Sequence, residues 1–252
     1  MSFNPFSLAG KSILVTGASS GIGRQTAISC ADMGARVIIT GRDAVRLEET
    51  RGRLEGDGHV AVAADLTDAA GLARVADAAG VVDGVAHCAG ISTIAPFRMV
   101  SEKAIDAVFK TNFHAPVLLT QRLLAKRQIA NGGSIVFISS TTAHIGTIAT
   151  SMYAASKGAL FPAARALGLE LATKQKIRVN CVSPGYVNTP LLDGINNGAA
   201  SIEQNYDLAP LGLGEPEDVA NAVVFLLASA SKWITRSTLI IDGGLTVPVS
   251  IS

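Results

Sequence analysis

A tyrosine and a lysine four positions apart, Tyr153 and Lys157 in the stretch SMYAASKGAL, could form an acid/base pair. On a helix these positions share one face, so the two side chains would point in the same direction. A free phenol has a pKa of about 10, too high for efficient proton exchange near neutral pH. A cation about 4 Å away contributes about 4 kcal/mol at an effective dielectric of about 20, and could lower that pKa by roughly three units. The pair alone is also a common helix-surface pattern, so the rest of the chain must decide.

A glycine-rich turn, VTGASSGIG, follows the first apolar segment and leads into a helix-like segment. Gly17, Gly21 and Gly23 are spaced G-x-x-x-G-x-G, which differs from the common dinucleotide pattern G-x-G-x-x-G. Glycines at a strand-to-helix turn let backbone N–H groups approach a pyrophosphate, and the helix N-terminus adds a partial positive charge. Ser19 and Ser20 add hydroxyl donors. The turn predicts nucleotide binding; the alternative is a tight turn without a ligand.

The composition of the 252-residue chain favours a single α/β domain. Hydrophobic residues make up 48% and charged residues 16%, as expected when a sheet is buried on both faces. The net charge of +1 at pH 7, without a dense basic run, does not indicate a nucleic-acid partner. The three cysteines are widely spaced without a metal-like cluster, and no apolar run reaches transmembrane length. We therefore expect a cytoplasmic protein with reduced thiols, no signal peptide and no membrane partner.

Short apolar segments alternate with helix-length segments, which predicts a doubly wound, Rossmann-like α/β fold: a seven-stranded parallel sheet with helices on both faces. Gly34 is expected to end the first helix, Asp43 to cap the second and Pro116 to bend the fourth. Strands are expected over 12–17, 36–41, 59–65, 83–90, 134–140, 176–185 and 237–244. Helices are expected over 22–33, 43–54, 67–79, 101–130, 151–173 and 216–228.

Six spaced motifs carry a resemblance that covers nearly the whole chain, from Lys11 to about Gly244. The motifs are TGASSGIG, Ala89-Gly90, Asn112, Ser140, YAASK at 153–157 and SPG at 183–185. In this order and spacing the chain resembles the short-chain dehydrogenase/reductase family in its common 250-residue form. The resemblance implies one domain over 1–252, with a cofactor half at about 11–110 and a catalytic and substrate half at about 111–252. It also implies a nicotinamide-dependent oxidoreductase acting on CH–OH groups.

The resemblance assigns the catalytic roles. Tyr153 would be the general acid in carbonyl reduction and the general base in alcohol oxidation. Ser140 has the family's spacing from Tyr153 and would hold the substrate oxygen at the tyrosine, whereas Ser139 should face the other way because strand residues alternate. Asn112 matches the family asparagine that holds a water linking Lys157 to solvent.

An arginine directly after the second strand favours NADP(H) over NAD(H). A ribose 2′-hydroxyl is read by a carboxylate, whereas a 2′-phosphate needs a cation. Asp43 lies about 20 residues past Gly23, but in NAD-using relatives the acid occupies the last strand position, here Gly41. Arg42, as in many NADP-using relatives, suits a phosphate dianion; a solvated surface arginine is the alternative. The cofactor-binding residues implied by the resemblance are Gly17, Ser19, Ser20, Gly21, Ile22, Gly23, Arg42, Asp65, Leu66, Ala89, Gly90, Tyr153, Lys157, Pro184, Gly185, Val187 and Thr189.

The substrate pocket is expected above the carboxyl ends of the strands, under a lid formed by the Gly/Asn-rich segment 186–215. That segment begins with apolar residues and contains acidic residues but no lysine or arginine, which favours a neutral ketone or secondary alcohol. One departure from the family pattern is Cys88 in place of the usual asparagine, which puts local rigidity in question. The expected lining is Ser92, Ser140, Thr142, His144, Met152, Tyr186, Leu191 and Leu192.

Two other functions remain open. The chain could be a 3-oxoacyl-carrier-protein reductase, for which Lys126 and Arg127 could form part of a basic docking patch. It could also be a non-catalytic, cofactor-binding regulatory protein, although the intact set of Ser140, Tyr153 and Lys157 argues against that. The resemblance further implies a homotetramer or homodimer, in which the helices at 101–130 and 151–173 pair across one interface. No metal is expected.

Overall fold

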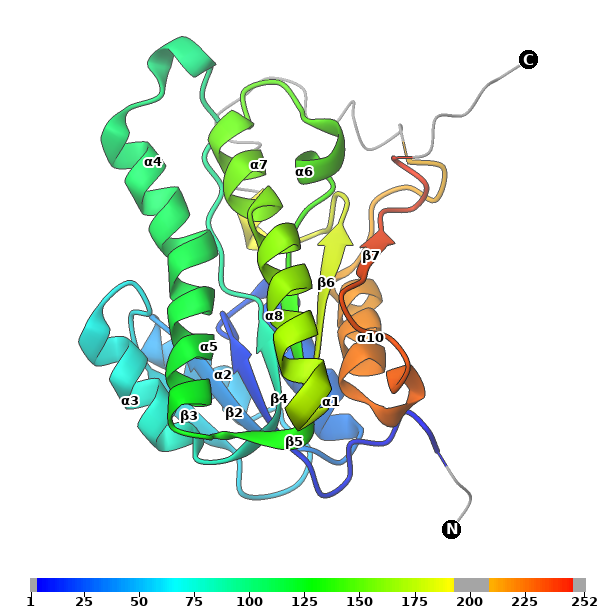
Figure 1. Ribbon diagram of the computed structural model, residues 1–252. Helices are drawn as coiled ribbons and strands as arrows, with labels where there is room; N and C mark the ends of the chain where they lie inside the picture. The colour runs from blue at the N-terminus through cyan, green and yellow to red at the C-terminus, as the bar shows by residue number, and fades with distance from the viewer. Residues whose placement is uncertain (1–3, 193–208, 247–252) are drawn as a thin grey trace.

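One parallel sheet forms the centre of the computed structural model, which describes residues 4–192 and 209–246 (Figure 1). Its strand order is β3-β2-β1-β4-β5-β6-β7, so successive crossovers run outward in opposite directions from β1 and β4. This confirms the seven-stranded, doubly wound sheet. The order reverses between β1 and β4, which opens a crevice at their carboxyl ends. The strands are β1 (Ser12–Thr16), β2 (Arg36–Gly41), β3 (Val60–Ala63), β4 (Val82–His87), β5 (Ile129–Ile138), β6 (Arg178–Pro184) and β7 (Thr238–Ile241).

Helices cover both faces of the sheet because successive residues of a strand point to opposite faces, and the residues on both faces are apolar. In β1, Ile13 and Val15 pack in one core with α1 (Gly21–Asp32), α2 (Ala44–Arg51) and α10 (Pro216–Leu227), whereas Leu14 packs in the other. The second core contains α3 (Ala69–Ala79), α5 (Ala115–Ala125) and α8 (Leu160–Gln175). The remaining helical segments are α4 (Glu102–Phe109), α6 (Thr142–Ile145), α7 (Ser151–Gly158), η1 (Phe97–Met99), η2 (Lys110–His114) and η4 (Ser229–Ser231). No helix in the described ranges is long and apolar enough to cross a membrane.

Two helix-end predictions are confirmed. Gly34 follows α1 with φ +89°, a left-handed conformation that favours glycine. Asp43 caps α2, since its Oδ1 accepts the backbone N–H of Arg46 at 3.0 Å.

The single helix expected over 101–130 is wrong in its middle. It is divided into α4, a π-helical turn (η2, Lys110–His114) and α5. Pro116 lies in the first turn of α5 and has no N–H, so the carbonyl of Asn112 lacks its ordinary i+4 donor. The helix is therefore irregular at Asn112, four residues before the proline that was expected to bend it.

The expected end of that helix and the start of the next strand are also wrong. Arg127 has φ 54°, which ends the helical conformation, and β5 begins at Ile129 rather than at residue 134. The register between β4 and β5 shifts between Val82 and Gly84 of β4. The extra residues opposite this step belong to β5 and include Gly132 and Gly133, so β5 carries a bulge there. The polar Asn-Gly-Gly stretch hides the first part of this strand from apolar-pattern analysis.

The helix expected over 151–173 is present as two consecutive helices, α7 and α8, and it continues to Gln175. Pro162 lies in the first turn of α8, the part of a helix in which a proline is tolerated.

A neutral histidine is buried where β4 meets α5. His87 is 3% exposed, stacks on Phe137 with ring centroids 5.0 Å apart, and places Nε2 2.8 Å from Thr120 Oγ1. The Thr120 hydroxyl donates to the Pro116 carbonyl, so it accepts the Nε2–H of His87. Nδ1 has no hydrogen-bond partner among the described residues. Burial lowers the pKa of His87 to about 3, which keeps the imidazole neutral in the folded protein.

This histidine should make the fold sensitive to acid. The unfolded chain protonates His87 near its ordinary pKa of about 6.5, whereas the folded chain resists protonation down to about 3, so its stability contribution is complete above 6.5 and decreases as the pH falls below it. By pH 4.5 the loss should be about 2–3 kcal/mol relative to pH 7. Urea unfolding at both pH values should show a smaller loss for His87→Leu than for the natural chain. A variant at the exposed His114 is the control, and equal losses in all three proteins would contradict the prediction.

Candidate functional site

The turn after β1 is packed directly against the turn after β4. Gly17 has φ +68°, and a Cβ at this position would lie 2.7 Å from the Ala89 backbone. A Cβ at Gly23 would lie 2.3 Å from the Gly17 carbonyl oxygen. The hydroxyl of Thr16 accepts the backbone N–H groups of both Cys88 and Ala89 at 3.1 Å. Glycine is therefore required at both positions, and one threonine ties β1 to the end of β4.

The Thr16 contact fixes the backbone at Cys88, the residue that stands where the family pattern has an asparagine. The two backbone N–H groups are held without a side-chain amide, and the Cys88 thiol lies 3.9 Å from Thr26 Oγ1. Cys30, Cys88 and Cys181 are all free thiols. Burial raises the pKa of Cys88 to about 12, so the thiol stays protonated at neutral pH.

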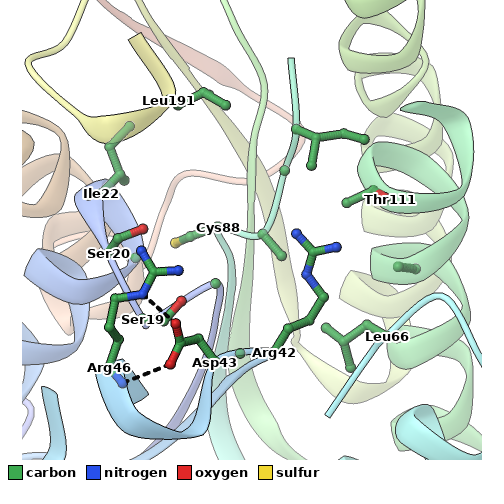
Figure 2. A pocket seen from close by; sticks show the side chains of 18 of the residues that line it. Ser19, Ser20, Ile22, Arg42, Asp43, Arg46, Leu66, Cys88, Thr111 and Leu191 are labelled. Atoms are coloured by element: carbon green, nitrogen blue, oxygen red, sulfur yellow. Dashed lines mark hydrogen bonds and ion pairs between the residues drawn. The ribbon is translucent and has the colours of Figure 1, made fainter. Parts of the chain in front are cut away.

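A cavity of about 250 Å³ lies above this pair of turns, and we refer to it as the nucleotide cavity (Figure 2). The expected cofactor residues that line it are Gly17, Ser19, Ser20, Gly21, Ile22, Gly23, Arg42, Asp65, Leu66, Ala89, Gly90 and Thr189. Its lining also includes Asp43, Arg46 and Thr67, which the sequence analysis did not assign to the site. The available signal for Arg46 was its position four residues after Arg42, at the start of a helix.

The lining of the nucleotide cavity has charged groups of both signs, among them the Asp65 carboxylate and the Arg42 guanidinium. Asp65 accepts hydrogen bonds from the backbone N–H and the hydroxyl of Thr67, which together with the more distant Arg42 keep the pKa of Asp65 below its usual range. The Arg42 side chain extends into the cavity near Leu66 in Figure 2. Within the described residues, its guanidinium makes no hydrogen bond or ion pair. It is available for an anion.

A second cavity of about 640 Å³ adjoins the first, since Ile22, Cys88, Gly90, Thr189 and Leu191 line both. We refer to it as the substrate cavity. The expected residues that line it include Ser92, Ser140, Thr142, Tyr153, Lys157, Pro184, Gly185, Tyr186, Val187, Leu191 and Leu192. Its lining further includes the unpredicted Ile94, Ile145, Thr147, Ile148, Ala149 and Leu245, which lie outside the strands and carry no motif.

Two expected lining residues, His144 and Met152, are not part of the substrate cavity. The ring of His144 instead lies 4.6 Å from that of Phe161, and its Nε2 is 3.0 Å from Ser183 Oγ. Of the expected lid over 186–215, residues 193–208 lie outside the described part of the chain.

Ser140 and Tyr153 meet on one wall of the substrate cavity. The Ser140 hydroxyl is close enough to the Tyr153 phenol to act against the rise in its pKa, and Ser140 Oγ accepts from the hydroxyl of Thr142 at 2.9 Å. The neighbouring Ser139 donates instead to the carbonyl oxygen of Lys157 at 2.9 Å. Both serines follow the end of β5 and line the substrate cavity, but their partners differ: Ser140 lies beside the tyrosine, and Ser139 holds the helix backbone.

The expected effect of Lys157 on the phenol is corrected. Burial raises the pKa of Tyr153, and only the hydrogen bond to Ser140 acts in the opposite direction. Lys157 is 4% exposed, and its ammonium donates to the carbonyl oxygen of Ile138 at 2.8 Å. Burial lowers the pKa of Lys157 to about 8. The lysine is itself a buried cation held by a carbonyl, so desolvation dominates at both members of the pair.

Asn112 uses its whole side chain to join three segments. Its Oδ1 accepts the backbone N–H of Ile91 at 2.9 Å, and its Nδ2 donates to the Ile91 carbonyl at 2.9 Å and to Ser156 Oγ at 3.0 Å. Gly90 fits closely beside this network, since a Cβ there would lie 3.1 Å from Lys157 Nζ and 3.3 Å from Asn112 Oδ1. The amide therefore fixes the segment after β4 and α7, and only the backbone carbonyl of Asn112 lacks its usual helical donor.

Lys126 and Arg127 lie at the other edge of the sheet. They connect the end of α5 to the start of β5, whereas Ser140 follows the end of β5 (Figure 1). Lys126 is paired with Asp77 on α3. A basic patch containing these two residues is therefore remote from the substrate cavity.

Removing the Asn112 side chain should destabilise the protein. Asn112→Ala breaks three hydrogen bonds at a buried position and should lower the free energy of unfolding by about 2–4 kcal/mol. Ser156→Ala removes one partner of the amide and should cost about 1 kcal/mol. Denaturant unfolding of both variants measures the two values. An Asn112→Ala protein as stable as the natural chain would show that the amide does not hold these segments.

Comparison with known proteins agrees with this geometry. Residues 17–246 match a family model described as "Enoyl-(Acyl carrier protein) reductase". The L-xylulose reductase of Mesocricetus auratus is 35% identical over 243 residues, which cover 95% of this chain and 98% of that protein.

Two solved structures share the fold. A 3-ketoacyl-(acyl-carrier-protein) reductase from Brucella melitensis, complexed with NADH, has a TM-score of 0.86 and 33% identity, covering 96% of this chain and 100% of that one. A short-chain type dehydrogenase/reductase from Mycobacterium marinum has a TM-score of 0.86 and 30% identity, covering 97% and 98% of the two chains. Together with the motifs and the paired cavities, these matches show that the chain is an oxidoreductase of the short-chain dehydrogenase/reductase family.

Proposed function

We propose that this protein is an NADP(H)-dependent reductase of neutral ketones that also oxidises the corresponding secondary alcohols. The observation that carries the proposal is the meeting of Ser140, Tyr153 and Lys157 at the substrate cavity, which adjoins the nucleotide cavity. A hydroxyl, a phenol and a buried cation can bind a carbonyl oxygen and supply its proton.

In reduction, the bound nicotinamide supplies a hydride to the carbonyl carbon. Ser140 Oγ–H donates a hydrogen bond to the substrate oxygen, and the Tyr153 phenol gives its proton to the same oxygen as negative charge develops there. The raised pKa of Tyr153 keeps the phenol protonated beforehand. Ser140, which acts to lower the pKa of Tyr153, stabilises the phenolate that remains, and the Lys157 ammonium can return a proton to it. The backbone carbonyl of Asn112, which has no i+4 N–H donor, can hold a water that returns a proton through Lys157.

Two features of the nucleotide cavity support NADP(H). Gly17 and Gly23 leave the close approach that a pyrophosphate needs, because any side chain there would collide with backbone. The Arg42 guanidinium, unpaired within the described residues, suits a 2′-phosphate. The remaining cofactor residues, including Pro184, Gly185 and Val187, line the substrate cavity at the end where a nicotinamide ring would lie.

The substrate cavity favours a largely apolar ketone. Most of its exposed surface is apolar, and Lys157 is its one basic or acidic side chain among the described residues. Neutral hydroxyls such as Ser92, Thr142 and Thr147 supply the polar contacts. The name of the matched L-xylulose reductase indicates a polyhydroxylated ketone for that protein, and such a substrate would have to place each of its hydroxyls against one of the cavity's serine, threonine or tyrosine hydroxyls rather than against its apolar surface.

A 3-oxoacyl-carrier-protein reductase is the second candidate, favoured by the likeness to the Brucella melitensis enzyme. Its carrier would have to dock near the mouth of the substrate cavity, and Lys126 and Arg127 do not serve there. A non-catalytic regulatory role is disfavoured because Ser140, Tyr153 and Lys157 are assembled rather than merely present.

The proposal is tested by the loss of NADPH absorbance with apolar ketones, diketones, sugars and 3-oxoacyl thioesters, repeated with NADH. We expect apolar ketones with NADPH to give the highest kcat/KM and Tyr153→Phe to lower it by about 10²-fold or more, because the variant has no acidic proton. Tyr186→Phe is the matched control for the loss of a cavity phenol. A preference for 3-oxoacyl thioesters would favour the second candidate. Tight coenzyme binding without turnover of any substrate, together with full binding by Tyr153→Phe, would favour the regulatory role.

The pH profile tests the role of Lys157. With its pKa at about 8, Lys157 loses its charge as the pH rises through that value, so kcat/KM for reduction should be level below about 7 and fall above about 8. Lys157→Met should be slower at every pH and should lack this limb. A limb that persists unchanged in Lys157→Met would belong to Tyr153 or to another group.

The proposed enzyme is a cytoplasmic homotetramer or homodimer. Leu118 on α5 and Leu169 on α8 are 47% and 57% exposed, which supports an apolar interface along these two helices. Light scattering after size-exclusion chromatography measures the number of subunits.

A further inference from the structure

The nucleotide cavity contains a second arginine at the end of β2. Arg42 follows the last residue of the strand, and Arg46 lies one helical turn later, in the first turn of α2. Both line the cavity, and in Figure 2 their guanidiniums extend into it from the same side, with Arg46 beside Ser20. The sequence pattern by itself indicates only Arg42 as a cofactor ligand.

Asp43 orients the Arg46 guanidinium but occupies only one of its N–H donors. Its Nε lies 2.7 Å from Asp43 Oδ2, while Asp43 Oδ1 accepts the backbone N–H of Arg46. A guanidinium has five N–H donors, and this contact uses one. Within the described ranges, neither terminal nitrogen of Arg46 makes a hydrogen bond or an ion pair. Two nitrogens in a fixed plane therefore remain for an anion.

A side chain at the last position of β2 would crowd Ser19. A Cβ at Gly41 would lie 3.2 Å from Ser19 Oγ and 3.3 Å from Ser19 Cβ, closer than ordinary contact. The carboxylate that would read a ribose 2′-hydroxyl from this position is absent, and Ser19 occupies its place. The polar groups left around this point are Ser19, Arg42, Arg46 and Asp43.

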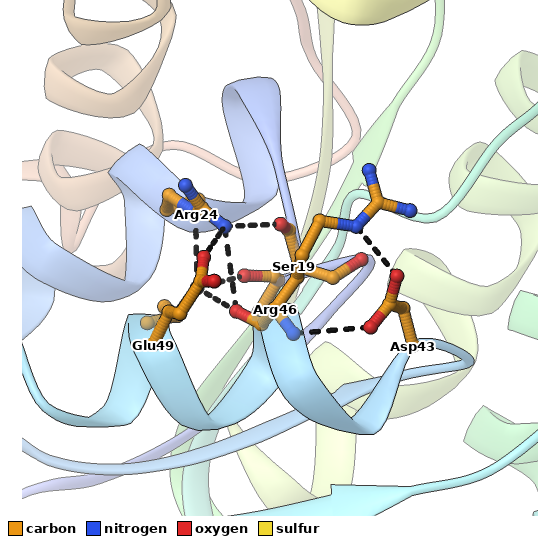
Figure 3. Close-up of polar contacts among 7 residues, drawn as sticks. Ser19, Arg24, Asp43, Arg46 and Glu49 are labelled. Atoms are coloured by element: carbon orange, nitrogen blue, oxygen red, sulfur yellow. Dashed lines mark hydrogen bonds and ion pairs between the residues drawn. The ribbon is translucent and has the colours of Figure 1, made fainter.

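A third arginine fixes the distance between the two sides of this site (Figure 3). The Arg24 guanidinium donates to the Ser19 carbonyl at 2.7 Å and to the Arg46 carbonyl at 3.3 Å. Its Nε donates to Thr50 Oγ1 at 3.0 Å, and it forms an ion pair with Glu49 at 3.4 Å. The glycine-rich turn and α2 are thus joined, so Ser19 and Arg46 face the cavity from a preset separation.

We propose that Arg46 is a second cationic ligand of the coenzyme's 2′-phosphate, acting with Arg42. The inference rests on the proposed NADP(H) function and deepens it. A phosphate dianion can accept hydrogen bonds from two guanidiniums at once. Because the Arg46 and Asp43 side chains are 52% and 38% exposed, water and salt weaken the interaction. Arg42, Arg46 and Asp43 together carry one net positive charge, so each arginine matters to a dianion.

The test isolates the 2′-phosphate from the nicotinamide. Calorimetry measures the Kd of adenosine 2′,5′-bisphosphate and of 5′-AMP for the natural chain and for Arg46→Gln, Arg42→Gln and Arg51→Gln. Arg51 is a matched control, because it lies on the same helix and pairs with Glu48 three residues away, as Arg46 pairs with Asp43. Arg46→Gln should weaken the bisphosphate about tenfold, leave 5′-AMP within about twofold and flatten the salt dependence. Arg51→Gln should change neither ligand.

Asp43→Asn gives an independent readout. Asparagine still caps α2, but the negative charge beside the phosphate is gone, so the bisphosphate should bind several-fold more tightly while 5′-AMP is unchanged. A marked loss of 5′-AMP or NADH affinity would identify Asp43 as a ribose ligand and would overturn the inference.

The remaining outcomes separate the inference from the function it rests on. If Arg46→Gln behaves like Arg51→Gln while Arg42→Gln loses the bisphosphate, Arg46 only pairs with Asp43, and the NADP(H) assignment stands without it. If the natural chain binds 5′-AMP as tightly as the bisphosphate and NADH as tightly as NADPH, the NADP(H) assignment itself fails. Melting temperatures within a few degrees of the natural chain show that the variants are folded.

Discussion

The contact between the turn after β1 and the turn after β4 is the constraint on which the site depends. At Gly17 the two backbones leave no space for a Cβ, and Thr16 holds the other turn by two backbone N–H groups. Parallel strands end at the same edge of a sheet, so this contact brings the glycine-rich turn beside Gly90 and Lys157. The nucleotide cavity and the substrate cavity meet at that point because both are built on it.

Burial determines the chemistry of the catalytic groups more than their pairing does. Lys157 is almost inaccessible, and a backbone carbonyl rather than a carboxylate balances its ammonium. The pKa of this lysine is therefore lowered and that of the Tyr153 phenol raised, each toward its neutral form. At neutral pH the phenol is therefore protonated, whereas the lysine, with a pKa of about 8, remains largely a cation. His87, which has no counterion either, stays neutral for the same reason.

Regular parts of the fold follow closely from local pattern. Continuous apolar segments predicted every strand of the sheet, and Gly34 and Asp43 marked helix ends correctly because their conformational and capping roles are local. The errors occur where local pattern and tertiary structure disagree. The π turn at Asn112 and the bulge that precedes Ser134 serve contacts with distant segments, and neither leaves a periodic signal.

The sequence by itself determined the sheet, the glycine turn and the identity of Ser140, Tyr153 and Lys157, because residue type and spacing are what these features require. Only the tertiary structure decided what surrounds them. It showed that the Asn112 amide is bound to neighbouring segments, that His144 and Met152 lie outside the substrate cavity, and that aliphatic loop residues form its walls. It also placed Arg46 in the lining of the nucleotide cavity, with Ser19 and Ser20 of the glycine-rich turn. Such contacts join residues far apart in the chain or in irregular loops, and their distances depend on how packed elements meet rather than on local propensity.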